Sequence, residues 1–283
     1  MSRSMKKANQ EIFSYLKDYA EKSGRSVSYH ERRIKLDEES QEWLKKLKII
    51  VKQSVSLRLQ FSFAEYNQDM YFISIGLDVD HDTIDERIGQ YGLNRIQENG
   101  GIFIALVSEL KIPVRNIIKS EEVLEVFYNT EENKPEDYDY EAISKFFESI
   151  QIYKITNEFI FIDPRYNQEE LWRLSVLFVS LLSSLIEEDT LPINLLNFTD
   201  ETKEMFIKVC LEGNSSLSYE NLFYSLTSFS WKHSFLEIYR CIEWLFEIVF
   251  LILFYRKIEI FILISILMMA QMMMNISEYM VVL

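Results

Sequence analysis

The sequence predicts an α+β fold, in which a mixed or antiparallel sheet domain with flanking helices is followed by an all-helical domain. In the first half of the chain, apolar and polar residues alternate as they do in strands. After residue 163, apolar residues recur at the three- and four-residue spacing of helices. The 283 residues suffice for two modest domains. We therefore divide the chain into an N-terminal α+β domain, 1–163, and a helical domain, 164–283.

Two helices are expected near the beginning of the chain. Helical apolar spacing covers residues 5–22 and stops at Gly24, and residues 38–53 predict a helix or a helix that passes into a strand. Residues 1–60 contain 14 Lys and Arg against 8 Asp and Glu, whereas the whole chain has a formal net charge of −14. Because the rest of the chain is acidic, broad binding to nucleic-acid phosphates is disfavoured. We interpret the basic residues 1–60 as a solvated helix pair.

The sheet is expected between residues 50 and 163. The predicted elements are a half-buried strand at 55–63, a strand at 70–79 that pairs with it as a hairpin, a buried run at 102–107, a strand at 121–128, an acidic loop at 129–141, a short helix at 140–149, and a second hairpin of 151–156 with 159–163. These segments together indicate an antiparallel or mixed sheet with helices at its edges.

Helices alone are expected after residue 163, at 168–187, 198–211, 219–227 and 231–255. Thr199 has the character of an N-cap for the second of them. Beyond them, residues 260–277 carry no charge, and six of the ten methionines lie at or after position 268.

This apolar C-terminal run is short for a membrane span, which needs about 20 apolar residues. Three interpretations therefore stay open. The first is membrane contact through 258–277, with Arg256 and Lys257 on the cytoplasmic side. The second is burial in a helical bundle or in a homodimer formed through the helical domain. The third is an altered reading frame that replaced a polar end.

Cysteine usage and the N-terminus indicate the compartment. Cys210 and Cys241 show neither disulfide nor zinc-site spacing, and the first residues lack the apolar core of a signal peptide. We expect a cytoplasmic protein, with membrane association, if any, through the C-terminal segment. The sequence has no P-loop, no dinucleotide fingerprint and no nucleophile elbow, and it indicates no cofactor.

An acidic cluster follows the strand predicted at 70–79. Asp78, Asp80 and Asp82 have the residue type and spacing to bind a hard cation. A calcium loop that starts at Asp78 fails further on, because Thr83 replaces the turn glycine and Gly89 replaces the bidentate glutamate. The alternative is an acidic helix N-terminus stabilised by the helix dipole.

The most distinctive segment is 231–246, WKHSFLEIYRCIEWLF. Its apolar stripe is Phe235, Ile238, Ile242 and Leu245, and its polar residues at helical spacing are His233, Glu237, Arg240 and Glu243. Such a polar row is either a solvated, ion-paired helix face or a polar seam buried inside a helical bundle.

This segment resembles the first long helix of HEPN-type helical domains, which occur in bacterial abortive-infection (phage-resistance) proteins of the lactococcal AbiJ type. The resemblance implies phage defence, with a sensing or binding N-terminal half, a helical effector or dimerisation half, and RNA or a phage component as partner. It leaves enzymatic activity open. The alternative is a non-enzymatic binding or membrane-associated protein without a defence role.

The ribonucleases of that family carry an R-x4–6-H motif on a later helix. No histidine follows Arg240 here, so the candidate catalytic residues are His233, Arg240 and Glu243 themselves. The only match in spacing is Arg25 with His30, which lies in a loop near the other end of the chain and which we interpret as a coincidence.

Overall fold

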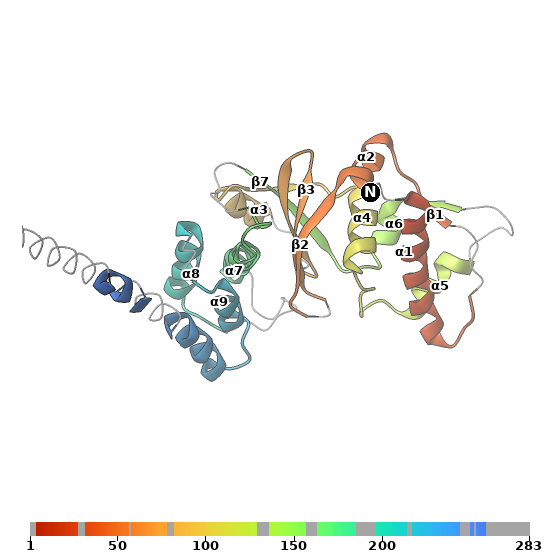
Figure 1. The fold of residues 1–283 in the computed structure, drawn as a ribbon. Helices are drawn as coiled ribbons and strands as arrows, with labels where there is room; N and C mark the ends of the chain where they lie inside the picture. Colours follow the sequence, from red (N-terminus) through yellow and green to blue (C-terminus); the bar gives the residue numbers. More distant parts are fainter. Residues whose placement is uncertain are drawn as a thin grey trace, which may run out of the picture.

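The fold is mixed α+β, as the sequence predicts. The structure, a computed structural model, describes residues 4–27, 32–56, 58–77, 82–128, 136–156, 163–184, 196–213, 217–243, 250–251 and 253–258. An antiparallel five-stranded sheet with helices forms the first part, and helices pack together in the C-terminal part (Figure 1).

The described elements comprise helices and short strands. The helices are α1 (Met5–Ala20), η1 (Glu21–Ser23), α2 (Glu38–Lys46), α3 (Asp82–Gly89), α4 (Gly100–Leu110), α5 (Ser120–Tyr128), α6 (Tyr140–Ser144), α7 (Glu169–Ser183), α8 (Asp200–Glu212) and α9 (Tyr219–Leu226). The strands are β1 (Arg32–Ile34), β2 (Lys48–Ser54), β3 (Gln60–Tyr66), β4 (Asp69–Ile75), β5 (Leu93–Ile96), β6 (Glu136–Tyr138) and β7 (Ile150–Ile155). Residues 231–243, 250–251 and 253–258 are also helical.

The main sheet has the strand order β2-β3-β4-β7-β5, and every adjacent pair is antiparallel. β3 and β4 form the predicted hairpin, whose turn residues Asn67 and Gln68 both have positive φ, as a tight two-residue turn requires. After β4 the chain forms α3 and then β5, which pairs with β7 and not with β4. β7 therefore lies between β4 and β5 in the sheet. A separate pair, β1 with β6, is parallel.

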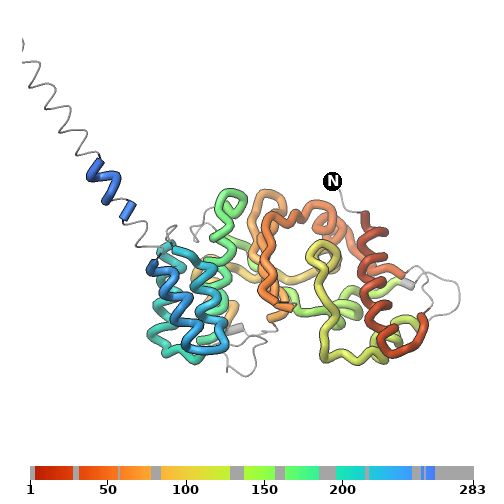
Figure 2. The backbone as a smooth tube through the Cα atoms, turned by 60° about the horizontal axis from the view of Figure 1, so that its bottom comes forward, coloured from red at the N-terminus to blue at the C-terminus, as the bar shows by residue number. Residues whose placement is uncertain are grey.

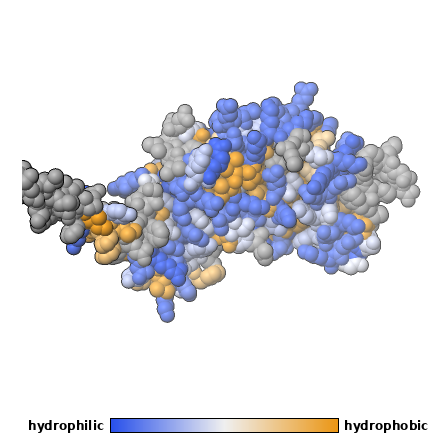
Figure 3. Space-filling model, in the orientation of Figure 1, coloured by the Kyte–Doolittle hydropathy of each residue, from blue (hydrophilic) through white to orange (hydrophobic). Residues whose placement is uncertain are grey.

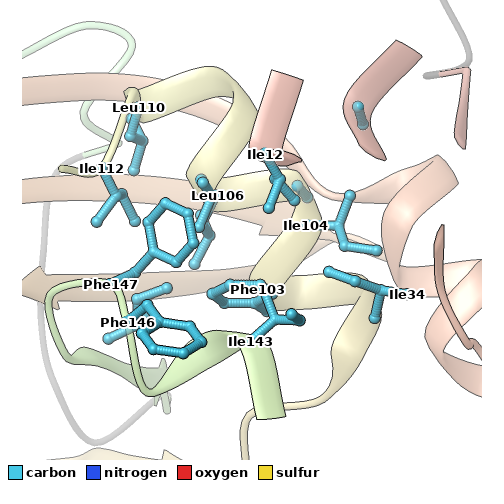
Figure 4. Packing of buried hydrophobic residues seen from close by; sticks show 14 of the residues in the cluster. Ile12, Ile34, Phe103, Ile104, Leu106, Leu110, Ile112, Ile143, Phe146 and Phe147 are labelled. Atoms are coloured by element: carbon cyan, nitrogen blue, oxygen red, sulfur yellow. The ribbon is translucent and has the colours of Figure 1, made fainter. Parts of the chain in front are cut away.

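Each face of the sheet has its own hydrophobic core. On one face, α1, α2, α4 and α6 cover the sheet, as Figure 1 shows. Figure 4 shows the centre of this core, where Phe103 of α4 meets Phe147 with ring centroids 5.6 Å apart. On the other face, Phe178 of α7 packs edge-on against Phe72 of β4 and Tyr153 of β7, at 5.5 and 5.4 Å.

The buried run predicted at 102–107 is the middle of helix α4. Helix α4 starts at Gly100 because Asn99 caps it: the Asn99 side-chain oxygen accepts hydrogen bonds from the backbone N–H groups of Gly101 and Ile102. Gly101 is needed for packing, because a Cβ there would lie 1.7 Å from the backbone oxygen of Ser40 in α2. The run is apolar on all sides because α4 is enclosed by the core that the sheet forms with α1, α2 and α6.

Three predictions in the sheet region are corrected. Residues 121–128 are not a strand but belong to α5: Val123, Leu124 and Phe127 are buried together at helical spacing. The strand predicted at 55–63 begins only at Gln60, because the preceding residues form a turn in which the Val55 N–H donates to the Leu59 carbonyl. That strand is also buried on both faces along its first five residues, not on one.

Two further expectations are met only in part by the described residues. The acidic loop at 129–141 contains β6, and the helix expected at 140–149 is the shorter α6. In the second predicted hairpin, 151–156 corresponds to β7, whereas 157–162 lie outside the described residues.

The helical half follows the prediction closely. α7, α8 and α9 occupy the expected segments, and the Thr199 side chain accepts the N–H of Thr202 as an N-cap. α7 is buried almost completely because it contacts the sheet on one side and α8 and α9 on the other. The division at residue 163 stays a prediction, since the helices that follow it share a core with the sheet.

The last described helical residues extend away from the body of the molecule. Figures 1 and 2 show the blue helical residues 250–251 and 253–258, which we call the projecting helix, beyond α8 and α9, at the end of the molecule opposite α1 and α5. Within the described ranges, no helix combines the length and the apolar character needed to cross a bilayer.

Candidate functional site

The C-terminal helices carry a concentration of solvent-exposed, large apolar side chains. We call these residues the apolar C-terminal surface. They form a stripe on the helix 231–243, made of Trp231, Phe235, Tyr239 and Ile242, and a group on the projecting helix, made of Phe250, Leu251, Leu253, Phe254, Tyr255 and Ile258. Large apolar side chains exposed in groups of this kind mark an interaction site more often than a solvated face.

The stripe is exposed because the helix 231–243 packs on the body through small residues. Ser234 is buried with its hydroxyl 2.9 Å from that of Ser225 in α9, and the buried Cys241 thiol donates to the Ser218 carbonyl at 3.5 Å. These small side chains contact the body, so the large ones on the neighbouring face point outward. Phe235 is 66% exposed. Trp231 is also exposed, although its ring makes a T-shaped contact with Phe198, with ring centroids 5.0 Å apart.

The projecting helix exposes its apolar residues over a wide arc. At about 100° per residue, Phe250, Leu251, Leu253, Phe254, Tyr255 and Ile258 cover roughly 200° of the circumference. A helix that packs one face on a core needs a stripe of only about 100°. Arg256 lies on the side opposite the arc, and Lys257 lies within it. Figure 3 shows this apolar segment as the orange atoms on the projecting helix.

The polar row predicted on this helix is solvated. Arg240 Nη1 donates to Glu237 Oε1 at 2.7 Å, with the arginine side chain 61% exposed. His233 and Glu243 are exposed, and the His233 backbone N–H donates to Ser230 Oγ. Glu237 differs from these exposed residues, because its side chain is only 14% exposed and its Oε2 is buried with no hydrogen-bond partner among the described residues. The row is therefore a solvated, ion-paired face except at Glu237. Because the arginine side is exposed to solvent, we expect the ion pair to contribute about 0–1 kcal/mol.

The apolar stripe predicted as Phe235, Ile238, Ile242 and Leu245 has an unexpected orientation. Phe235 and Ile242 are exposed and Ile238 is half-buried, while Leu245 lies outside the described residues. A helix with one apolar stripe normally turns it to the core. Here the stripe remains available to a partner.

The acidic residues proposed as cation ligands are only partly described. Asp78 and Asp80 lie outside the described residues, and Asp82 begins α3 without a described side chain. In the described part of the chain, no three His, Cys, Asp or Glu side chains converge as they would around a metal ion. The cation site at these three aspartates stays a prediction.

The carboxylate of Asp85, three residues after Asp82, is hydrogen-bonded to other side chains of the protein. Asp85 of α3 accepts a hydrogen bond from Arg95 Nη1 of β5 at 3.0 Å and from the Tyr153 hydroxyl of β7 at 3.5 Å. Burial raises the pKa of Tyr153 above its usual range, and the Asp85 charge adds to the effect. The contacts join α3 to the sheet, which gives Asp85 a structural role.

The structure does not test the pair Arg25 and His30, which matched only in spacing. Arg25 is an exposed residue in the irregular segment after Gly24, whose φ is 80°, and His30 lies outside the described residues. The interpretation of this pair as a coincidence stays a prediction.

A buried carboxyl group at the start of α4 was not found from the sequence. Glu98 precedes the N-cap Asn99, and its Oε1 is buried with no hydrogen-bond partner among the described residues. Burial raises the pKa of Glu98 to about 8; Arg95 lowers it and Glu141 raises it by smaller amounts. The sequence offers no signal for this burial, because Glu98 sits in a short polar loop.

A second group that the sequence did not reveal is the ion pair inside the helical half. Arg173 Nη2 lies 2.7 Å from Glu170 Oε2, with the side chains 3% and 6% exposed. Arg173 Nη1 also donates to the Cys210 carbonyl of α8 at 2.7 Å. The pair joins α7 to α8. Its only sequence signal is the i, i+3 spacing on a strongly apolar helix.

The cysteines are poor nucleophiles in this fold. Both are buried, and burial raises the pKa of Cys210 to about 12 and that of Cys241 to about 11. At neutral pH both thiols are therefore protonated, whereas the thiolate is the reactive form.

Comparisons with protein-family models, with curated proteins and with solved structures give no match to this chain. The candidate site therefore rests on the geometry of the chain itself.

Proposed function

We propose that this protein acts by non-covalent docking through its apolar C-terminal surface, and that its role is phage resistance of the abortive-infection type. The observation that carries the docking proposal is the outward orientation of Trp231, Phe235, Tyr239 and Ile242 beside the apolar projecting helix. The defence role is supported by the resemblance of 231–246 to HEPN-type helices. In this proposal the sheet half senses or binds a phage component, and the helical half is the docking module.

Ribonuclease chemistry is not part of the proposal. In the described part of the chain, the side chain that pairs with Arg240 is Glu237 and not a histidine. General acid–base catalysis needs a titratable group within hydrogen-bond reach of the reacting atoms. The exposed His233, Arg240 and Glu243 remain candidates only if a substrate organises them.

The test is a plaque assay in a phage-sensitive bacterial host, with a broad phage panel. We expect the gene to lower plating of at least one phage. The double substitution Phe235→Asp with Phe254→Asp should restore plating, because both side chains are exposed and contribute to docking rather than to folding. Ile117→Asp, at an exposed apolar residue far from this surface, is the matched control and should retain resistance.

Two results would contradict the proposal in different ways. Plating unchanged by the wild-type gene across the panel would refute the defence role and leave a binding or membrane-associated protein without one. Resistance that persists in the double variant would show that the apolar C-terminal surface is not the functional docking site.

A further inference from the structure

We infer that the partner of the apolar C-terminal surface is a lipid bilayer, and that the projecting helix lies in the interface between headgroups and acyl chains. This inference deepens the docking proposal and rests on it. It names the chemistry of the partner, which is apolar and can cover an arc wider than one packed helix face.

The width of the apolar arc is the first argument. A second copy of this chain that packed one helix against the projecting helix would cover a stripe of about 100°. The observed arc of roughly 200° would then leave half of its apolar residues in water. Lipid covers the whole arc at once, because acyl chains have no fixed shape.

The polar residues of the projecting helix are the second argument. An interfacial helix keeps its cations at headgroup level while its apolar residues enter the acyl region. Arg256 lies opposite the arc, and Lys257 has a long stem that lets its ammonium group reach the headgroups from within it. Tyr255 adds an aromatic ring with a polar tip, a residue type enriched at this level of the membrane.

The direction of the helix is the third argument. Residues 250–251 and 253–258 extend away from the rest of the molecule and lie clear of α8 and α9 (Figure 2). The sequence then continues with the uncharged residues 260–277. The apolar character therefore increases toward the C-terminus, and the acidic body stays at a distance from lipid phosphates.

The experiment is co-flotation of the full chain with vesicles. The probes are phosphatidylcholine vesicles and vesicles of phosphatidylcholine with phosphatidylglycerol. We expect the protein to float with both kinds and to remain bound in high salt, because apolar burial dominates. The substitution Phe254→Asp should weaken binding at least about tenfold, since it removes a large apolar side chain from the acyl region. The control Ile117→Asp should bind as the wild type does.

Several results would overturn the inference. One is failure of the wild-type chain to float with either kind of vesicle. Another is binding that requires phosphatidylglycerol, disappears in salt and is unchanged by Phe254→Asp, which would make the contact electrostatic. A third is a vesicle-free dimer in light scattering that Phe254→Asp dissociates, which would assign the surface to a second copy. Vesicle binding without any effect on phage plating would uphold the inference and refute the defence role.

Discussion

The buried carboxyl group of Glu98 should make the stability of this protein depend on pH in a defined window. Its pKa is about 8 in the folded protein against the usual 4.5, chiefly because burial disfavours the charged form. A carboxyl group with a raised pKa contributes stability that is fully present below the unfolded value and is lost as pH rises through the folded value. The window therefore runs from about pH 4.5 to about pH 8.

The size of the effect follows from the shift in pKa. Each pKa unit corresponds to about 1.36 kcal/mol, so full ionisation of Glu98 would cost the folded state roughly 5 kcal/mol. The residue as a whole is only partly buried, and access of water reduces this to about 2–4 kcal/mol. Glu98→Gln removes the ionisation while it keeps the shape of the side chain.

Urea unfolding of the wild type and of Glu98→Gln at several pH values measures this contribution. We expect the variant to gain stability relative to the wild type steadily from pH 5 to pH 8, and the difference to level off above that. Glu122→Gln, at an exposed glutamate, is the matched control and should show no such trend. Parallel curves for Glu98→Gln and the wild type between pH 5 and pH 9 would refute the reasoning, because Glu98 would then ionise as it does in water.

Three further substitutions test the packing. Arg173→Ala should lower the free energy of unfolding by about 3–5 kcal/mol, because it leaves the buried Glu170 carboxylate without its cation; an unchanged urea midpoint would contradict this. Arg240→Ala should change it by no more than about 0.5 kcal/mol, since the arginine side chain is 61% exposed, and a larger shift would show that the largely buried Glu237 carboxylate depends on it. Gly101→Ala should reduce thermal stability strongly, because the new Cβ would clash with a backbone oxygen of α2; a wild-type melting temperature would show that the two helices separate easily.

Much of the fold could be predicted from local sequence signals. The hairpin of the strands at 55–63 and 70–79 was predicted from their alternating pattern, and its turn residues Asn67 and Gln68 both adopt the positive φ that a tight turn needs. The start of α8 was predicted because Thr199 can cap a helix. Each of these signals depends on a few neighbouring residues and not on the tertiary fold.

The errors arose where tertiary contacts decide the structure. Residues 121–128 are a short segment of β-branched and aromatic residues mixed with three glutamates, which fits a strand as well as a helix. Helix α5 forms because Val123, Leu124 and Phe127 all face the core there. The burial of β3 on both faces was not predictable from its alternation, because its small residues Ser62 and Ala64 face a second layer of helices.

The candidate site was predicted less well than the fold. Phe235 and Ile242 were recognised as a stripe, but a stripe in a sequence does not show whether the protein itself covers it. The orientation of the stripe depends on Ser234 and Cys241. Their small side chains pack against α9 and the residues before it, so the large residues of the helix face outward. The acidic residues Asp78 and Asp80 lie outside the described residues, so their predicted role as ligands stays open.

The most direct measurement of the central claim is the depth of the projecting helix in a bilayer. A Phe254→Cys variant can be labelled selectively with an environment-sensitive fluorophore, because Cys210 and Cys241 are both buried. On addition of vesicles we expect a blue shift of the label and quenching by lipids brominated along the acyl chain, while a label at Ile117→Cys stays unchanged. A label at position 254 that remains in water when vesicles are present, or that shifts with protein concentration alone, would contradict docking on a lipid bilayer.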